Sequence, residues 1–216
     1  MREPALAIDA RFLHIRDAHP DPQTDEDSAI ALGELAKLDR LTARLSTLMQ
    51  LEGELPVQDV DVDAFVRRTV HRWSPVAARR WLGASTAGTV TANEERLQAA
   101  VDSLIENAIR FTRDGDRVEL HAWRDRGQAV IEVRDTGAGV AEADQPHIFE
   151  RFWSRGPGDT RSSTGLGLAI AKAAVEARGG TLAVSSRSGE GTTFTIRLPV
   201  HMPPAALHGS DLVTAG

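Results

Sequence analysis

A glycine-punctuated segment that runs directly into a helical pattern constrains this chain more than any other feature. Residues 161–180 read RSSTGLGLAIAKAAVEARGG, in which the apolar positions recur at helical spacing. Gly165 and Gly167 permit a left-handed backbone and the close approach of a bound group. Free N–H groups at the start of a helix favour an anion. The segment therefore predicts a phosphate-binding loop joined to a helix, with an ordinary turn before a helix as the alternative.

The overall composition narrows the class of protein. With 216 residues, the chain is long enough for one sizeable core and a smaller element. Its net charge of −6 argues against nucleic acid as a partner, and the absence of cysteine excludes a disulfide framework. No run reaches the roughly 18 apolar residues of a membrane-spanning helix, and the first residues lack the apolar core of a secretion signal. We therefore expect a cytoplasmic protein without a membrane segment.

Residues 1–53 predict part of a helical hairpin. A first helical stretch ends at the prolines within residues 19–22, and a second stretch covers residues 30–51. The second stretch carries a seam at Leu38, Leu41, Leu45 and Leu48. Steps of three, four and three residues are typical of a coiled coil. We predict a homodimer through this seam; the alternative is that the seam packs on the second domain of its own chain.

The remaining pattern predicts a second domain over residues 54–200. Alternating strand patterns cover residues 57–62, 89–91, 117–123, 128–134, 181–186 and 192–198. Three helical patterns are present. The first covers residues 63–73, the second begins at its cap Asn93 and ends near Thr112, and the third follows Gly167. Helices on a mostly antiparallel sheet predict an α+β fold, a two-layer α/β sandwich. Residues 201–216 are expected to form a disordered tail.

Three further motifs give the glycine-rich segment its meaning. They read SLIENAIRFT at residues 103–112, DTGAGV at 135–140 and IFERFW at 148–153. In this order, and followed by residues 161–180, they resemble the N, G1, F and G2 boxes of the ATP-binding domain of sensor histidine kinases. The resemblance covers residues 57–200. It implies a Bergerat-type ATP-binding fold, ATP and Mg²⁺ as cofactors, and phosphoryl transfer to a histidine for relay to a response regulator receiver domain.

The resemblance also implies three catalytic residues on one helix. Asn107 corresponds to the Mg²⁺ ligand of the family, and a neutral oxygen donor suits a metal that keeps several waters and bridges phosphates. Arg110 corresponds to a basic residue that contacts phosphate, and an isolated surface arginine is the alternative. Glu106 is a candidate for orienting water or metal, and its alternative is a solvated charge.

The nucleotide-binding residues implied by the resemblance extend along the remaining boxes. Asp135 follows an apolar strand, where its carboxylate can accept a hydrogen bond from the adenine amino group and so select adenine over guanine. Phe111 is expected to lie against the adenine, with core packing as the alternative. The set is completed by Gly137, Gly139, Thr164, Gly165, Leu166, Gly167 and Leu168. A lid over residues 154–164 is expected to be mobile and anchored by Phe149, Phe152 and Trp153.

One residue departs from the family pattern. The box usually carries an asparagine where this chain has Ser103, and related gyrase and chaperone ATPases carry a glutamate on that turn as general base. A serine cannot act as a general base near neutral pH. Slow hydrolysis is therefore expected, and phosphoryl transfer to a histidine is the favoured reaction. A non-catalytic nucleotide-binding module and an anti-sigma-type serine kinase are the alternatives.

The position of the phosphoacceptor is also open. Arg2 and Pro4 resemble the end of the family motif His-x-x-Arg-x-Pro, so the acceptor histidine is expected before Met1, on the full-length chain or on a separate subunit. Within the chain, His14 lacks an acidic neighbour and His19 precedes a proline at a helix break. Neither histidine is favoured as the acceptor.

Overall fold

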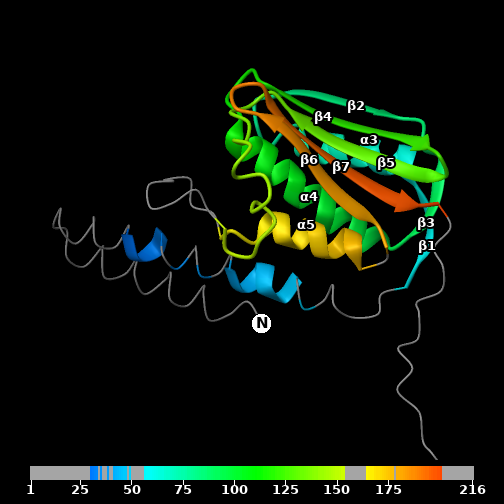
Figure 1. Cartoon of the computed structure of the whole chain (residues 1–216), viewed down its shortest axis with the longest axis horizontal. Coiled ribbons are helices and arrows are strands. Elements are labelled where there is room, and N and C mark those ends of the chain that lie inside the picture. The colour runs from blue at the N-terminus through cyan, green and yellow to red at the C-terminus, as the bar shows by residue number, and fades with distance from the viewer. Residues whose placement is uncertain are drawn as a thin grey trace, which may run out of the picture.

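The computed structural model describes residues 30–33, 35, 38, 41–47, 49, 56–153, 164–177 and 179–200. The described residues between 30 and 49 are helical, as predicted. After them come β1 (Gln58–Asp61), α3 (Val62–Trp73), β2 (Arg80–Ser85), β3 (Thr89–Ala92), α4 (Glu94–Phe111), β4 (Arg117–Asp125), β5 (Gln128–Asp135), α5 (Gly167–Glu176), β6 (Thr181–Arg187) and β7 (Gly191–Pro199) (Figure 1).

A five-stranded sheet in the order β2-β4-β5-β7-β6 forms one layer of the domain. All neighbouring pairs are antiparallel except β2 with β4. The β4–β5 hairpin turns at Arg126 and Gly127, which have φ of 47° and 78°. Positive φ at both central residues is the geometry that matches the twist of a two-residue hairpin. Strands β1 and β3 form a separate antiparallel pair.

Helices α3, α4 and α5 form the second layer, against one face of the sheet. Along that face Leu120, Val133 and Phe194 lie opposite one another on β4, β5 and β7, and each is at most 2% exposed. The other face is polar: Thr195 donates a hydrogen bond of 3.1 Å to Glu132 on the neighbouring strand. One apolar and one polar face per strand is the pattern of a sheet covered on one side. The predicted two-layer α/β sandwich is confirmed, with α4 and α5 side by side (Figure 1).

Helix α4 begins and ends where the sequence predicts. The Asn93 side chain accepts a hydrogen bond of 2.7 Å from the backbone N–H of Arg96, which satisfies a first-turn donor. The helix ends at Phe111 with Thr112 as its C-terminal cap. Its core-facing side includes Leu104 and Ala108, which are fully buried. The other face of α4 is therefore available to line a binding site.

The structure differs from the sequence prediction at one strand of the sheet. Strand β2 has no counterpart among the predicted elements. It is an edge strand whose side chains are exposed or half-buried, so the alternation that identifies the other strands is absent. Strand β4 also runs two residues past its predicted end, to Asp125, and β5, β6 and β7 each run one residue past theirs. The predicted first helix, most of the lid and the tail lie outside the described residues.

The leucine seam is divided between two environments. Leu41 is half-buried and packs against the core of the sandwich, whereas Leu38 and Leu45 are 57% and 45% exposed. Leu48 lies outside the described residues. One seam position thus contacts the chain's own second domain, as the alternative interpretation predicted, and two remain open to solvent. In the described part of the chain, no helix combines the length and apolar character needed to cross a bilayer.

Candidate active site

A cleft opens between α4, the loop after β5 and the start of α5. It encloses about 880 Å³ of empty space, which includes open solvent. Eight of the predicted site residues line it: Glu106, Asn107, Arg110, Phe111, Gly139, Gly165, Gly167 and Leu168. The other four, Asp135, Gly137, Thr164 and Leu166, are not among the residues that line it.

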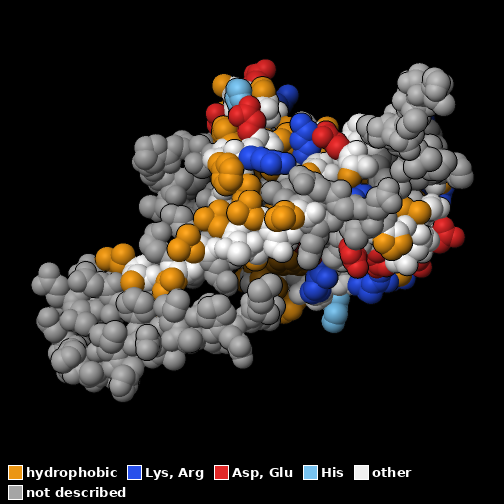
Figure 2. Space-filling view, turned by 90° about the horizontal axis from the view of Figure 1, so that it is seen from below, with side chains coloured by type: hydrophobic (Ala, Val, Ile, Leu, Met, Phe, Trp, Pro, Cys, Tyr) orange, Lys and Arg blue, Asp and Glu red, His pale blue; other side chains and the backbone are white. Residues whose placement is uncertain are grey.

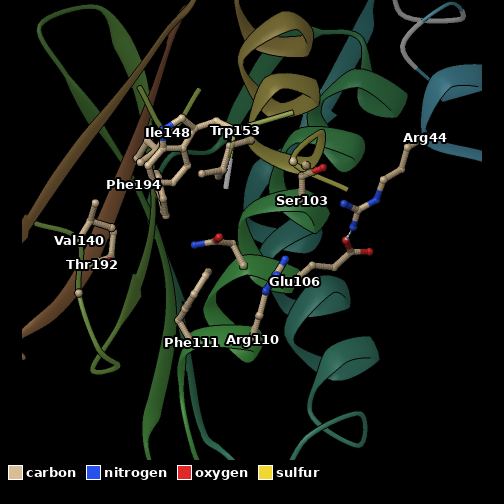
Figure 3. Close-up of a pocket in the computed structure, with 15 residues that line it drawn as sticks. Arg44, Ser103, Glu106, Arg110, Phe111, Val140, Ile148, Trp153, Thr192 and Phe194 are labelled. Atoms are coloured by element: carbon tan, nitrogen blue, oxygen red, sulfur yellow. Dashed lines mark hydrogen bonds and ion pairs between the residues drawn. The ribbon is translucent and has the colours of Figure 1, made fainter. Parts of the chain in front are cut away.

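The polar wall of the cleft is one face of α4. Ser103, Glu106 and Arg110 project from adjacent turns on the same side of the helix (Figure 3). Asn107 lies one residue after Glu106 and three before Arg110, so its spacing places it on that side as well. The Arg110 guanidinium lies 5.3 Å from the centre of the Phe111 ring. The cleft therefore receives an amide, a carboxylate and a guanidinium from a single rigid element.

Asp135 is the buried carboxyl group of the site. It ends β5 in the register of Ile131 and Val133, whose side chains face the core, and it is 2% exposed. Its Oδ1 accepts a hydrogen bond of 2.8 Å from the Gly137 N–H, and the backbone of Thr192 provides another. Burial raises the pKa of the Asp135 carboxyl to about 6, although both hydrogen bonds act in the opposite direction. The oxygens of this carboxyl group can accept a further hydrogen bond, which suits a ligand that donates one, such as an amino group.

The loop after β5 is clamped from two sides. The N–H of Ala138 donates to the carbonyl of Phe111 over 3.1 Å, and the N–H of Gly189 donates to the carbonyl of Ala138 over 2.8 Å. Gly139 has φ of +66°, and a Cβ atom there would lie 2.0 Å from the Arg187 carbonyl oxygen. The glycine is thus required by the packing of the chain on itself, quite apart from any ligand.

An apolar wall faces α4 across the cleft, and sequence reasoning missed most of it. Val140, Ile148, Thr192 and Phe194 all line the cleft, but they come from loops and strands distant in sequence. Phe149 packs edge-on against Phe194 with ring centres 6.2 Å apart. The sequence signal for Thr192 and Phe194 was the period-two pattern of β7, which predicts burial but does not identify a site. Val140 and Ile148 lie within two of the motifs but were not among the predicted site residues. This wall suits a flat apolar group such as a purine base.

The aromatic anchors predicted for the lid behave differently from one another. Phe149 and Trp153 are half-buried against the core, as an anchor requires. Phe152 is 62% exposed and has φ of 65°, so the prediction that it anchors the lid is wrong. Its backbone N–H instead donates to the carbonyl of Gly165 over 2.9 Å, which ties the segment to the start of α5.

The start of α5 presents backbone rather than side chains to the cleft. Leu166 is fully buried and contributes its side chain to the core. No side chain caps the helix, and no acidic residue lies in its first turn. Thr164 accepts a hydrogen bond from Arg44, a residue of the helical segment that also lines the cleft. Sequence reasoning missed Arg44, because nothing near it in the chain indicates where its helix docks.

The residues of the cleft suit a magnesium ion that is shared with a nucleotide. In the described part of the chain, no three histidine, aspartate or glutamate side chains converge on one point. Magnesium nevertheless needs few protein ligands when phosphates and waters supply the others. The amide of Asn107 offers a neutral oxygen at the cleft, beside the carboxylate of Glu106. These donors fit Mg²⁺ bound through a polyphosphate.

A two-layer sandwich with a polar helix face and an uncapped helix start around one cleft, and with a buried carboxyl group at the end of a neighbouring strand, defines a Bergerat-type ATP-binding domain. Sequence comparison agrees. Residues 92–202 match the family described as histidine kinase-, DNA gyrase B- and HSP90-like ATPase, and the chain belongs to this family.

Within this family the chain is similar to sensor kinases. It is 44% identical over 120 residues to sensor protein DivL of Caulobacter vibrioides, and this alignment covers 56% of the chain and 15% of DivL. It is 33% identical over 194 residues to sensor-like histidine kinase SenX3 of Mycolicibacterium smegmatis, over 85% of the chain and 50% of SenX3. The crystal structure of full-length ShkA in complex with AMPPNP matches 94% of the chain and 44% of ShkA, with a TM-score of 0.72 and 25% identity. The chain therefore spans half or less of these relatives and contains the ATP-binding catalytic domain of a histidine kinase.

Proposed function

We propose that this domain binds Mg-ATP in the cleft and transfers the γ-phosphoryl group to a histidine imidazole, for relay to an aspartate of a response regulator receiver domain. The observation that carries the proposal is the buried carboxyl of Asp135, which lies at the end of β5 near a cleft whose other wall carries Asn107. This arrangement offers an acceptor for the adenine amino group and a metal ligand for the phosphates. ATP and receiver domains meet in the cytoplasm, where we place the domain.

The base is held at the end of the cleft formed by the β5 loop. Asp135 accepts a hydrogen bond from the adenine amino group, while guanine would present an oxygen to the same carboxylate. Val140 and Ile148 give the base an apolar wall, and Phe111 lies against the ring or its ribose. Gly137 supports this end indirectly, by donating its N–H to Asp135. Desolvation of the base strengthens its one directed hydrogen bond.

The phosphates are held between α4 and the start of α5. Asn107 would hold the Mg²⁺ ion, and a bound Mg²⁺ would neutralise part of the phosphate charge. Arg110 and the first backbone N–H groups of α5, beginning at Gly167, stabilise the remaining phosphate charge. Thr164, Gly165, Leu166 and Leu168 shape this loop, mainly through their backbone. Glu106, which directly precedes Asn107 on α4, orients a water or the metal.

The chemical step requires little from the protein beyond positioning. An imidazole nitrogen bonds to the γ-phosphorus while the bond to the β–γ bridging oxygen breaks and ADP leaves. Ser103 lines the cleft and cannot act as a general base for water, which favours the histidine over hydrolysis. Of the histidines in the described part of the chain, His71, His121 and His147, none lines the cleft. The acceptor is therefore offered by another segment, on the same full-length chain or on a partner.

The helical segment forms the dimer interface of the proposed kinase. The exposed Leu38 and Leu45 offer an apolar surface to a second copy, and we retain residues 1–53 as a partial dimerisation hairpin. Residues 54–200 are the proposed catalytic domain, with residues 201–216 as a tail. The dimer supplies the symmetry that brings an acceptor hairpin close to a catalytic domain.

Titration calorimetry with ATP, ADP and GTP tests the proposed site. We expect Mg-dependent binding of ATP and ADP in preference to GTP, and Asp135→Ala to weaken adenine nucleotides by roughly 1.5–3 kcal/mol through loss of a charged acceptor. Asn107→Ala should remove the Mg²⁺ dependence. Asp125→Ala is the matched control, because Asp125 also ends a strand of the same sheet but pairs with Arg197 on the surface. Unchanged adenine nucleotide affinity in Asp135→Ala would refute the assignment.

Incubation with γ-labelled ATP and a separate acceptor hairpin tests the reaction. Acid-labile label on the hairpin supports histidine phosphorylation, whereas acid-stable label favours a serine kinase. ATP binding without any label favours a non-catalytic module. Labelling of the chain alone, abolished by His14→Ala or His19→Ala, would place the acceptor inside the chain.

A further inference from the structure

One side chain of the helical segment enters the ATP cleft. Arg44 Nη2 lies 2.5 Å from Glu106 Oε2, and Nη1 donates a hydrogen bond of 2.8 Å to Thr164 Oγ1. Figure 3 shows Arg44 reaching from the segment toward Glu106. The Arg44 side chain is 28% exposed, so most of it is withdrawn from solvent. The segment thus contributes a fixed cation to a site that the other domain otherwise forms.

The position of the guanidinium is unfavourable without an anion. A Cβ atom added to Gly167 would lie 3.4 Å from Arg44 Nη1, so the cation lies next to the first residue of α5. The N-terminal end of a helix carries partial positive charge, and a cation beside it is destabilised. In this structure Glu106 provides the compensating negative charge. A bound phosphate at the start of α5 would provide more of it.

An apolar contact holds the segment in this position. Leu41 lies three residues before Arg44, on the same side of the helix, and packs against the core of the sandwich. Leu41 and Arg44 therefore dock the segment together, one through apolar packing and the other through polar contacts at the cleft. The guanidinium is placed by packing rather than by its ion pair alone.

Arg44 lies at the end of the cleft farthest from the base. Val140 and Thr192 line the opposite side in Figure 3, and Thr192 is a backbone partner of Asp135. A nucleotide with its base at Asp135 therefore extends its phosphates toward Arg44. The terminal phosphate is the group that comes nearest to the guanidinium.

We propose that Arg44 is a phosphate-binding residue of the ATP site. When ATP binds, the Arg44 guanidinium leaves its ion pair with Glu106 and binds the γ-phosphate instead. The inference rests on the proposed function, since it requires ATP in this cleft. A guanidinium can donate two parallel hydrogen bonds to phosphate oxygens, and the terminal phosphate carries more charge than a carboxylate. ADP lacks the phosphate that reaches this end. Arg44, held at this end by the docked helical segment, therefore makes the site bind ATP more tightly than ADP.

Calorimetric titration of Arg44→Ala with Mg-ATP and Mg-ADP tests the inference. ATP affinity should fall roughly tenfold or more, as expected for losing a charged hydrogen-bonding partner, while ADP affinity changes less than about twofold. Arg68→Ala is the matched control: Arg68 also forms an ion pair from a helix, with Glu94 on α4, but lies outside the cleft. This control should leave both affinities unchanged.

A second variant separates phosphate binding from a purely structural role. Arg44→Lys keeps the charge but loses the planar fork, so it should recover part of the ATP affinity with ADP still unaffected. Equal losses for ATP and ADP, or no loss for either, would show that Arg44 only docks the segment and would overturn the inference. If the wild type bound no ATP at all, the proposed function would fail, and the inference with it; the wild-type titration distinguishes the two failures.

Discussion

Gly191 lies directly against the backbone of Asp135, such that a Cβ atom added to Gly191 would be 2.0 Å from the Asp135 carbonyl oxygen. Gly191 also has φ of +95°, a left-handed conformation that other residues adopt only with strain. The next residue, Thr192, provides a backbone hydrogen bond to the Asp135 carboxyl. The close contact of β5 with the start of β7 therefore determines where this carboxyl points.

The first prediction concerns this contact. Gly191→Ala should lower the free energy of unfolding by at least about 3 kcal/mol, because the added methyl group combines backbone strain with a clash that the backbones must relieve. Gly189→Ala is the matched control in the same turn: its φ is +84°, but nothing lies within 4 Å of its added Cβ. The control should lose only about 1–2 kcal/mol. Urea unfolding of both variants measures the difference, and equal losses would contradict the proposed contact.

The second prediction concerns the pH dependence of adenosine binding. The pKa of Asp135 is raised to about 6, so its carboxyl becomes protonated between pH 7 and 5 and loses acceptor strength. Adenosine affinity should therefore fall by up to about tenfold between pH 7 and pH 5. Adenosine is chosen because it has no phosphate that titrates in this range. Asp135→Asn keeps an acceptor oxygen without a titrating group, and a pH-dependent affinity in this variant would assign the effect to another residue.

The same raised pKa predicts a stability difference. The folded protein binds this proton more tightly than the unfolded chain, whose Asp pKa lies near 3.8. The stabilisation is therefore fully present below about pH 4 and is lost as the pH rises through 6. Relative to Asp135→Asn, the wild type should gain stability as the pH falls from 7 to 4. Thermal melts of the two proteins across this range would contradict the raised pKa if the difference stayed constant.

The third prediction concerns the C-terminal end of α4. Arg79 has a side chain that is only 10% exposed, and it donates hydrogen bonds of 2.8 Å to Thr112 Oγ1 and 3.0 Å to the Thr112 carbonyl. Arg79→Ala should cost roughly 2–3 kcal/mol, because buried acceptors lose a charged donor. The neighbouring Arg80 is exposed and donates to the Gly115 carbonyl, so Arg80→Ala should cost less than about 1 kcal/mol. Urea unfolding should rank the two variants in this order, and the reverse order would rule out Arg79 as the anchor.

The fourth prediction concerns assembly. Replacing the exposed Leu38 and Leu45 together with serine should raise the dissociation constant of the proposed dimer by at least about tenfold, because each buried leucine contributes roughly 1.5–3 kcal/mol. Sedimentation equilibrium over a range of concentrations measures the effect. Leu82→Ser is the control, since Leu82 is 48% exposed on the edge strand β2. A wild type that remains monomeric at high concentration would reject the dimer.

Segments with strong local patterns could be predicted well. The boundaries of α4 follow from the Asn93 cap and the spacing of its apolar residues, and the β4–β5 and β6–β7 hairpins follow from alternation around glycine turns. Capping and periodicity act within one or two turns of the chain, so a short window contains the whole signal. The four boxes indicated the site residues for the same reason, and eight of these residues line the cleft.

Features that depend on distant partners could not be predicted in this way. Strand β2 exists because β4 offers it an edge, and its own residues lack alternation. Arg44 reaches Glu106, 62 residues further along the chain, through the docking of one helix. The glycines of the β5 loop illustrate the same difference: motif and spacing indicated that the loop approaches a nucleotide, whereas packing showed that Gly139 is needed against the Arg187 carbonyl. The local sequence thus determined the helices and strands and the kind of site. Contacts between distant segments determined how the cleft closes and which side chains enter it, because no short stretch of sequence contains the free energy of those contacts.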